Sequence, residues 1–431
     1  MLLALKNSTV INNMPRYSVR FARFLAFLVG GDSVAAASRR RPWPNRGARM
    51  VGLLDGWVAW AGCGGAWRAV GGGLLGLTLL APLPRLGAAE RLDRENLLVF
   101  HAAPDRVMPV KSIADWTQRR AEILAGAQAV MGPLPGAAKR VPLDVTVVQE
   151  TDCGTYVRRE IVYTAEPGGR VPAYLLVPKA VLSGGKRVPG VLALMPTNNI
   201  EGNRPVVGLG SPEAKPGRNY GEELAQRGFV VIAPPYPHLG DYRPDLKGLG
   251  YASGTMKAIW DNLRALDVLA ATPGVAPGGF GAIGHSLGGH NSIYTALFDE
   301  RIKVVISSCG FDSFLDYYQG KPEVWRAGGG WTQDRYMPIL AGYAGRLAAI
   351  PFDFHELIGA LAPRAFLALA PIGDSNFKWQ SVDRVIAAAR PVFALYQVPA
   401  RIAVDHPAGP HDFTPEMRAR AYAWLEKFLV E

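Results

Sequence analysis

The chain has 431 residues, more than one ordinary domain needs, and its 49% hydrophobic content is enough for a large core. The net charge of +11 would suit an anionic partner, but residues 1–89 carry 11 lysines and arginines against two acids, a net +9, and leave only +2 for the rest. The basic charge therefore belongs to the N-terminal segment, which argues against nucleic-acid binding by the remaining residues.

Residues 1–89 lack the sequence pattern of a folded domain, and we interpret them as a leader. A basic residue precedes a 13-residue apolar run over 69–81, and small residues over 87–89 follow it. This order is typical of a secretory signal cleaved after Ala89, so we expect an exported protein, periplasmic or extracellular. Two alternatives stay open: an uncleaved membrane anchor, for which the run is short, and an extension upstream of a true start at Met50.

Residues 90–431 are predicted to form one α/β domain. A helical flank is expected over 90–140, where Ser112 can cap a helix with apolar residues at helical spacing. Polar and apolar residues then alternate over 143–178, as they do in antiparallel strands at a sheet edge. Further along, continuous apolar runs alternate with helical stretches, which predicts a mostly parallel central sheet with helices on both faces. These runs are 188–195, 229–234, 280–283, 303–308 and 365–371.

A segment rich in aromatic residues, 311–353, interrupts this alternation. It follows the strand expected to end at Ser308 and contains Trp325, Trp331 and Tyr336. We interpret it as a small cap insertion over the site, with these three side chains as candidates for a substrate pocket. A packed excursion with a small core of its own is an equally good interpretation.

The motif Gly-His-Ser-Leu-Gly over 284–288 lies between an expected strand and an expected helix. Strand, G-x-S-x-G and helix, in that order, is the context of a nucleophile elbow. Its turn is so tight that the residues two before and two after the serine must be small, and Gly284 and Gly288 meet this demand. We predict that Ser286 is a nucleophile; an ordinary strand–helix turn containing a serine is the alternative.

A serine hydroxyl needs a base to take its proton, and the base needs a carboxylate to orient it. His411 is the predicted base because it lies in a loop between the last expected strand and the last helix, with His406 as runner-up. Asp374 is the predicted acid because it is the first carboxylate after the preceding strand, ahead of Asp383 and Asp405. This gives the chain order serine, acid, histidine.

The negative oxygen of a tetrahedral intermediate needs preorganised N–H donors. One donor is expected to be the backbone N–H of Leu287, at the start of the helix. The second should come from the loop 196–199, where Pro196 has no N–H, so Thr197 or Asn198 must supply it. Of these two we favour Thr197.

Cys153 and Cys309 are the two cysteines that follow the leader, and both one disulfide and two free thiols are compatible with the sequence. Neither has a CxxC or histidine-rich neighbourhood, so we expect no metal site. The glycines over 71–73 lack the lysine and hydroxyl of a phosphate-binding loop, and no cofactor is expected. The sequence makes no prediction of oligomeric state.

Several segments of the chain resemble exported bacterial α/β-hydrolases related to dienelactone hydrolases, acetylxylan-esterase-like enzymes and the catalytic domain of prolyl oligopeptidases. The segments are 166–178, 251–262, 284–290, 307–311, 351–354, 374–377 and 411–413, within a resemblance that covers roughly 91–430. It implies an α/β-hydrolase fold with a Ser-Asp-His triad at Ser286, Asp374 and His411. The chain departs from these relatives at Met195-Pro196-Thr197, where they read His-Gln-Thr, and at Ala-Pro-Pro-Tyr over 233–236, where they tend to read Ala-Pro-Asp-Tyr. The first departure bears on the geometry of the oxyanion hole.

The resemblance implies a serine hydrolase that cleaves carboxylic esters through an acyl-enzyme, with a small-molecule or carbohydrate ester as substrate. A peptidase of the prolyl oligopeptidase type is one alternative, although too few residues precede the elbow to hold a β-propeller as well. A catalytically inactive hydrolase fold used for binding is another.

Overall fold

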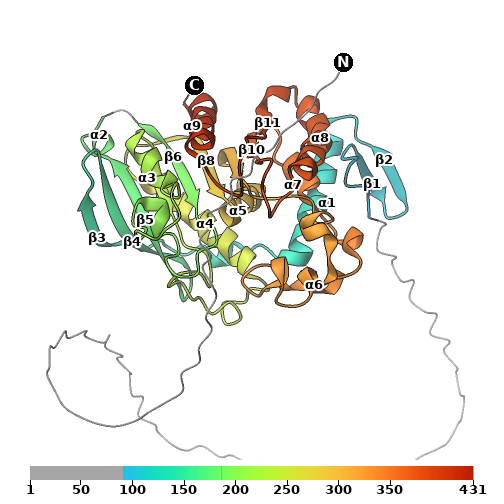
Figure 1. Cartoon of the computed structure of the whole chain (residues 1–431), viewed down its shortest axis with the longest axis horizontal. Coiled ribbons are helices and arrows are strands. Elements are labelled where there is room, and N and C mark those ends of the chain that lie inside the picture. Colours follow the sequence, from blue (N-terminus) through green and yellow to red (C-terminus); the bar gives the residue numbers. More distant parts are fainter. Residues whose placement is uncertain (1–90, 186, 431) are drawn as a thin grey trace, which may run out of the picture. The chain divides into compact units, whose positions relative to one another are not determined.

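The computed structural model describes residues 91–430 apart from Lys186, so the predictions made for the leader fall outside the described residues. Its centre is a nine-stranded sheet in the order β11-β10-β9-β8-β6-β7-β5-β4-β3, flanked by helices (Figure 1). Its strands are β3 (Thr146–Asp152), β4 (Tyr156–Glu166), β5 (Gly169–Pro178), β6 (Val188–Leu194), β7 (Val230–Ala233), β8 (Val275–His285), β9 (Ile302–Ser308), β10 (Ala365–Leu369) and β11 (Ile402–Asp405).

The six strands from β6 to β11 run parallel to one another, and β3, β4 and β5 form an antiparallel edge. Every residue of β7 and β10 is buried, as expected for parallel strands covered on both faces, whereas most of β3 is exposed. The predicted fold class is confirmed: this is the mostly parallel sheet of the α/β-hydrolase fold, with antiparallel strands at its N-terminal end.

Helices cover both faces of the sheet. Leu192 and Leu194 of β6 belong to one core cluster, with α1, α4, α5, α7 and α8, while Val191 and Ala193 belong to a second, with α3 and α9. The helices are α1 (Ile113–Met131), α2 (Lys179–Leu182), α3 (Tyr220–Gln226), α4 (Gly254–Ala271), α5 (Leu287–Phe298), α6 (Pro322–Trp325), α7 (Phe354–Gly359), α8 (Trp379–Leu395) and α9 (Pro415–Leu429). In the described part of the chain, no helix combines the length and the apolar character that crossing a membrane requires.

The N-terminal flank is only partly helical. Ser112 caps α1 as predicted, and its side chain and that of Asp115 form a reciprocal capping box. Before α1, however, β1 (Val99–Ala103) and β2 (Arg106–Pro109) form a separate antiparallel hairpin. The helical prediction was wrong over these residues because Pro104-Asp105 forms a turn, and the short runs on either side of it pair as a hairpin.

The start of the described chain is bound to α7 and to the end of the segment 311–353, which was predicted to be a cap and is called the cap segment below. Arg91 forms two hydrogen bonds of 2.6 Å with the carboxylate of Glu356, which also accepts from Arg119 at 2.6 Å. Glu356 in turn accepts the backbone N–H of Asp353, whose carboxylate binds the backbone N–H of Phe314 inside the cap. Residues far apart in sequence therefore fix the base of the cap together.

A second ionic cluster is buried beside the antiparallel strands. The Lys257 side chain on α4 is completely buried and pairs with Asp261 on the same helix and, at 3.0 Å, with Glu166 of β4. The hydroxyl of Tyr242 donates to Asp261 at 2.8 Å. Because each charge has a partner, the cluster ties α4 to the edge of the sheet without leaving an isolated buried ion.

The two cysteines of the described chain are both free thiols. Cys309 is buried directly after β9, and Cys153 lies half-buried after β3. Of the two possibilities that the sequence left open, the structure has the unpaired one.

Candidate active site

The motif over 284–288 forms the predicted sharp turn between β8 and α5. Ser286 has φ 55° and ψ −119°, a strained conformation for a residue with a side chain. A Cβ on Gly284 would lie 2.7 Å from the Gly288 Cα, and one on Gly288 would lie 2.6 Å from the Leu194 carbonyl carbon. Neither position has room for a Cβ atom, so both residues must be glycine. The turn holds the serine hydroxyl clear of the sheet.

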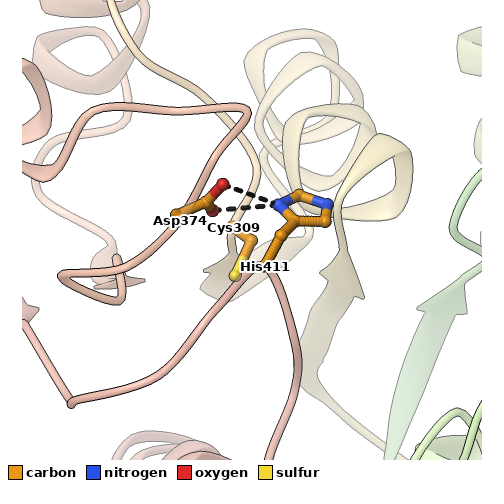
Figure 2. Close-up of side chains that lie close together, drawn as sticks. All are labelled: Cys309, Asp374 and His411. Atoms are coloured by element: carbon orange, nitrogen blue, oxygen red, sulfur yellow. Dashed lines mark hydrogen bonds and ion pairs between the residues drawn. The ribbon is translucent and has the colours of Figure 1, made fainter. Parts of the chain in front are cut away.

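Three side chains from separate loops meet at this turn. His411 Nε2 lies 3.0 Å from Ser286 Oγ, and His411 Nδ1 lies 2.9 Å and 3.0 Å from the two carboxylate oxygens of Asp374. Figure 2 shows the Asp374 carboxylate facing the imidazole. With the Nδ1 proton donated to the carboxylate, Nε2 is free to accept the serine proton, which is the arrangement an activated nucleophile needs.

The other candidates for base and acid lie elsewhere. His406 is bonded through Nε2 to Asp383 at 2.8 Å and through Nδ1 to the Ala370 carbonyl, so both of its nitrogens are occupied away from Ser286. Asp405 pairs with Arg420 at 2.8 Å. The structure therefore brings together the three residues favoured from chain order, and none of the runners-up.

Asp374 also organises its own loop after β10. Its Oδ1 accepts the backbone N–H groups of Asn376 at 2.7 Å and Phe377 at 3.1 Å, and its side chain is 1% exposed. The carboxylate is therefore both a turn cap and the partner of His411.

Two elements beside Ser286 carry the backbone groups predicted as oxyanion donors. The N–H of Leu287 is the first of α5, and such groups have no partner within their helix. Thr197 and Asn198 follow β6 and line the same cavity as Ser286, and the Thr197 hydroxyl lies 3.1 Å from the Tyr336 hydroxyl. The loop is thus placed where a second donor is needed, and the choice of Thr197 stays a prediction.

The cavity above Ser286 has a volume of about 210 Å³. Its wall contains four residues that sequence reasoning did not single out, two of them cationic. The lining residues are Pro196, Thr197, Asn198, Pro205, Lys215, Arg218, His285, Ser286 and His411. Lys215 and Arg218 lie in a polar segment before α3, and this segment has no apolar pattern from which its position in the fold could be predicted.

The aromatic residues predicted for the substrate pocket lie mainly inside the cap. Trp325 is fully buried edge-on against Phe314, and the ring of Trp331 lies 4.4 Å from that of His290. Neither lines the cavity, and Tyr336 approaches it only through the hydroxyl bonded to Thr197. The interpretation as a packed excursion describes these rings better, because large aromatic side chains gain most by stacking on one another away from water.

Two further histidines near the site are held neutral. Burial, followed by the positive charges around it, lowers the pKa of His285 well below its ordinary value, and burial lowers the pKa of His290 to about 3. His285 Nδ1 lies 3.2 Å from the Ser308 hydroxyl, and His290 Nδ1 lies 3.1 Å from the Gly310 carbonyl. These contacts account for both rings as structural groups.

Cys309 lies beneath the acid–histidine pair (Figure 2). One potential ligand atom from each of Cys309, Asp374 and His411 falls within 4.8 Å of the others, which raises the question of a metal. Burial, reinforced by the negative charge of Asp374, raises the pKa of the thiol well above its ordinary value, whereas a metal ligand must be a thiolate. Since both nitrogens of His411 are already bonded, the donor set does not fit a metal ion, and the thiol instead donates to the Asp412 carbonyl at 3.3 Å.

Comparison with known proteins gives a consistent set of relatives. The family model for fungal glucuronyl esterase matches residues 245–396, less than half of the chain. The protein YtaP of Bacillus subtilis (strain 168), described as a hydrolase, is 28% identical over 219 residues, which are 49% of this chain and 69% of YtaP. The 4-O-methyl-glucuronoyl methylesterase 1 of Sodiomyces alcalophilus is 29% identical over 158 residues, 34% of this chain but only 32% of that protein.

Solved structures share the fold over most of the domain. A glucuronoyl esterase from Solibacter usitatus superposes with a TM-score of 0.62 at 18% identity and covers 78% of this chain and 98% of its own. At that identity the likeness establishes architecture alone. The sheet order and this superposition show that the chain has the α/β-hydrolase fold, and part of its sequence is similar to glucuronoyl esterases.

Proposed function

We propose that this protein is a serine hydrolase that cleaves carboxylic esters through an acyl-enzyme intermediate. The observation that carries the proposal is the continuous hydrogen-bonded chain from Ser286 Oγ through His411 to Asp374, at 3.0 Å and 2.9 Å. Such a chain raises the nucleophilicity of a hydroxyl that is otherwise a poor nucleophile at neutral pH.

In the proposed reaction Ser286 Oγ attacks the ester carbonyl while His411 Nε2 takes its proton. The negative oxygen that forms is stabilised by the N–H of Leu287 and by a donor from the loop after β6, with Thr197 as our choice. His411 then gives its proton to the leaving alcohol, and the acyl group stays on the serine. Water, activated by the same imidazole, releases the acid, while Asp374 keeps the imidazole oriented and stabilises its charged form.

For the substrate we propose a small-molecule or carbohydrate ester, because relatives named as glucuronoyl esterases and methylesterases recur among the matches. The open cavity of about 210 Å³ at Ser286 suits a small ester group presented at the surface of a larger molecule.

We also propose that the protein is exported, on the strength of the leader pattern alone. N-terminal sequencing of the secreted protein tests that point: a start at Glu90 supports it, and a chain retained whole inside the cell contradicts it.

The function is tested with a fluorophosphonate probe and p-nitrophenyl acetate, using protein that starts at Glu90. We expect the probe to label Ser286, and Ser286→Ala to lose labelling and to lower kcat by about 10⁶-fold. Ser292→Ala is a matched control on α5, since the Ser292 hydroxyl bonds the Gly288 carbonyl and not the histidine. Folded protein that neither binds the probe nor cleaves the ester would favour a binding protein and overturn the proposal.

A further inference from the structure

We propose that the preferred substrates are esters that carry a free carboxylate close to the scissile bond, because Lys215 and Arg218 form one wall of the Ser286 cavity. The inference rests on the proposed hydrolytic function and adds the class of substrate. It is carried by the composition of the cavity wall, which contains two cations and, among the described residues, no carboxylate.

Arg218 is held rigidly with donors to spare. The residue is 7% exposed, and its Nη1 donates to Asp412 at 2.8 Å and to the Pro216 carbonyl at 3.2 Å. Within the described chain, Nε and Nη2 have no protein acceptor, yet neither is among the atoms wholly shut off from solvent. Because Arg218 lines the cavity and is otherwise buried, these free N–H groups are available to a ligand oxygen there, in the planar arrangement that suits a carboxylate.

Lys215 brings a second charge close to the base. Its Nζ lies 3.1 Å from the backbone oxygen of His411 and 3.9 Å from Asp412 Oδ1, and its side chain is 56% exposed. Lys215 and Ser286 thus both contact His411, Lys215 at its backbone oxygen and Ser286 at Nε2. The lysine adds a compact positive charge, and the arginine adds a planar set of donors that suits a carboxylate.

The negative groups nearby do not cancel both cations. Against the opposing effect of burial, the hydrogen bond from Arg218 lowers the pKa of Asp412, so this carboxylate is charged and offsets one cation. Asp374 lies behind the imidazole with its side chain 1% exposed. Glu201 is occupied by the Asn198 amide and lies outside the wall of the cavity. Lys215 and Arg218 are therefore the cations that face the cavity itself, and the nearby carboxylates lie outside its wall.

The two charges act on the residue next to the nucleophile. After burial, the charge of Arg218 is the largest contribution that lowers the pKa of His285, and Lys215 acts in the same direction. His285 directly precedes Ser286 and lines the same cavity. A carboxylate placed beside the ester is thus attracted to the position from which the serine attacks.

The test compares charged with neutral esters in two pairs, of which the first shares its leaving group and the second shares its acetyl group. For a carboxylate on the acyl side, p-nitrophenyl hydrogen glutarate is measured against p-nitrophenyl pentanoate; for one on the alcohol side, 4-acetoxybenzoate is measured against 4-acetoxybenzamide. We expect kcat/KM to favour the charged ester in one of these pairs by about tenfold at low salt, and the preference to shrink at high ionic strength.

Variants separate recognition from damage to the triad. Lys215→Gln and Arg218→Gln should each lower the charged-to-neutral ratio severalfold, mainly through KM, while Arg218→Lys retains part of it. The ratio is the readout because displacement of His411, which Arg218→Gln risks, would slow both esters alike. Lys303→Gln is the matched control, since Lys303 is an exposed lysine at the start of β9, at the other end of the parallel strands from Ser286.

The possible outcomes distinguish this inference from the function on which it rests. A ratio near one in both pairs for the wild-type protein, with the neutral esters still cleaved, overturns the substrate class and leaves the hydrolase proposal intact. A ratio that is high but unchanged in both glutamine variants also overturns it, because the selectivity then arises elsewhere. Absence of cleavage of every ester, with the protein folded, overturns both.

Discussion

Replacing Asp374 by asparagine tests the assignment of the acid without removing the shape of the loop. Asparagine keeps one oxygen, which can continue to accept the backbone N–H groups of Asn376 and Phe377 that now bond Oδ1. Its NH₂ group then takes the place of the second carboxylate oxygen, 2.9 Å from His411 Nδ1. The retained oxygen also lies 3.0 Å from Nδ1, but it already accepts two backbone N–H groups. With a donor at the shorter distance, we expect Nδ1 to become the acceptor and the imidazole proton to move to Nε2, where it faces the Ser286 hydroxyl.

With a proton on Nε2 the histidine cannot take the serine proton. We therefore expect kcat to fall by about 10⁴-fold, which corresponds to about 5.5 kcal/mol in the activation free energy. The free energy of unfolding should change by only about 1 kcal/mol, since the turn bonds survive. The rate of p-nitrophenyl acetate hydrolysis gives kcat, and urea denaturation gives the free energy of unfolding.

Asp383→Asn is the matched control. Asp383 is also an aspartate bonded to a histidine, at 2.8 Å from His406 Nε2, but this pair lies away from Ser286. The control should leave kcat within about twofold of the wild-type value. If Asp374→Asn kept activity within tenfold of wild type while folded, the histidine would not depend on this carboxylate, and the assignment would be refuted.

Three further predictions concern the elbow, the buried ions and the buried histidines. Gly288→Ala should abolish activity or yield no folded protein, because its Cβ would meet the β6 backbone at 2.6 Å; activity and circular dichroism near those of wild type would contradict this. Lys257→Met should lower the free energy of unfolding by about 3–5 kcal/mol, because two buried carboxylates lose a shared cation; urea denaturation measures it, and a loss below 1 kcal/mol would speak against the cluster. His290 is neutral in the folded protein, with a pKa of about 3, but binds a proton below about pH 6.5 when the chain is unfolded. Its contribution to the free energy of unfolding is therefore fully present above pH 6.5 and is lost as the pH falls towards 3, by up to about 1.4 kcal/mol per pH unit. His290→Gln should flatten this acid side of the stability curve, and an unchanged slope would show that the imidazole is not the group responsible.

The parts of the molecule that follow local rules could be predicted from the sequence. Continuous apolar runs predicted the buried parallel strands, since only a sheet covered on both faces tolerates them. The elbow depends on five adjacent residues whose steric demands are local, so Ser286 stood out without knowledge of the fold. His411 and Asp374 followed from chain order, because the ends of parallel strands meet at one edge of the sheet.

The remaining features depend on contacts between distant segments. The sequence around Trp325 is compatible with a side chain that contacts substrate and with one buried in a core. Only the packing of Phe314 against Trp325 decides between the two. Lys215 and Arg218 lie in a loop without periodicity, so their place beside His411 follows from tertiary structure alone. The strands of the hairpin β1–β2 are too short to give a periodic pattern of apolar residues, so the sequence alone does not reveal them.

The bond between Arg91 and Glu356 joins residues 265 positions apart, and it has a consequence for how the chain matures. During synthesis Arg91 is added early, and its contact with Glu356 can form only after most of the domain has been synthesised. Trimming by a protease even two residues beyond Ala89 would deprive a buried carboxylate of one of its two cations and loosen the root of the cap. Wherever the mature chain begins, this contact requires that Arg91 be retained.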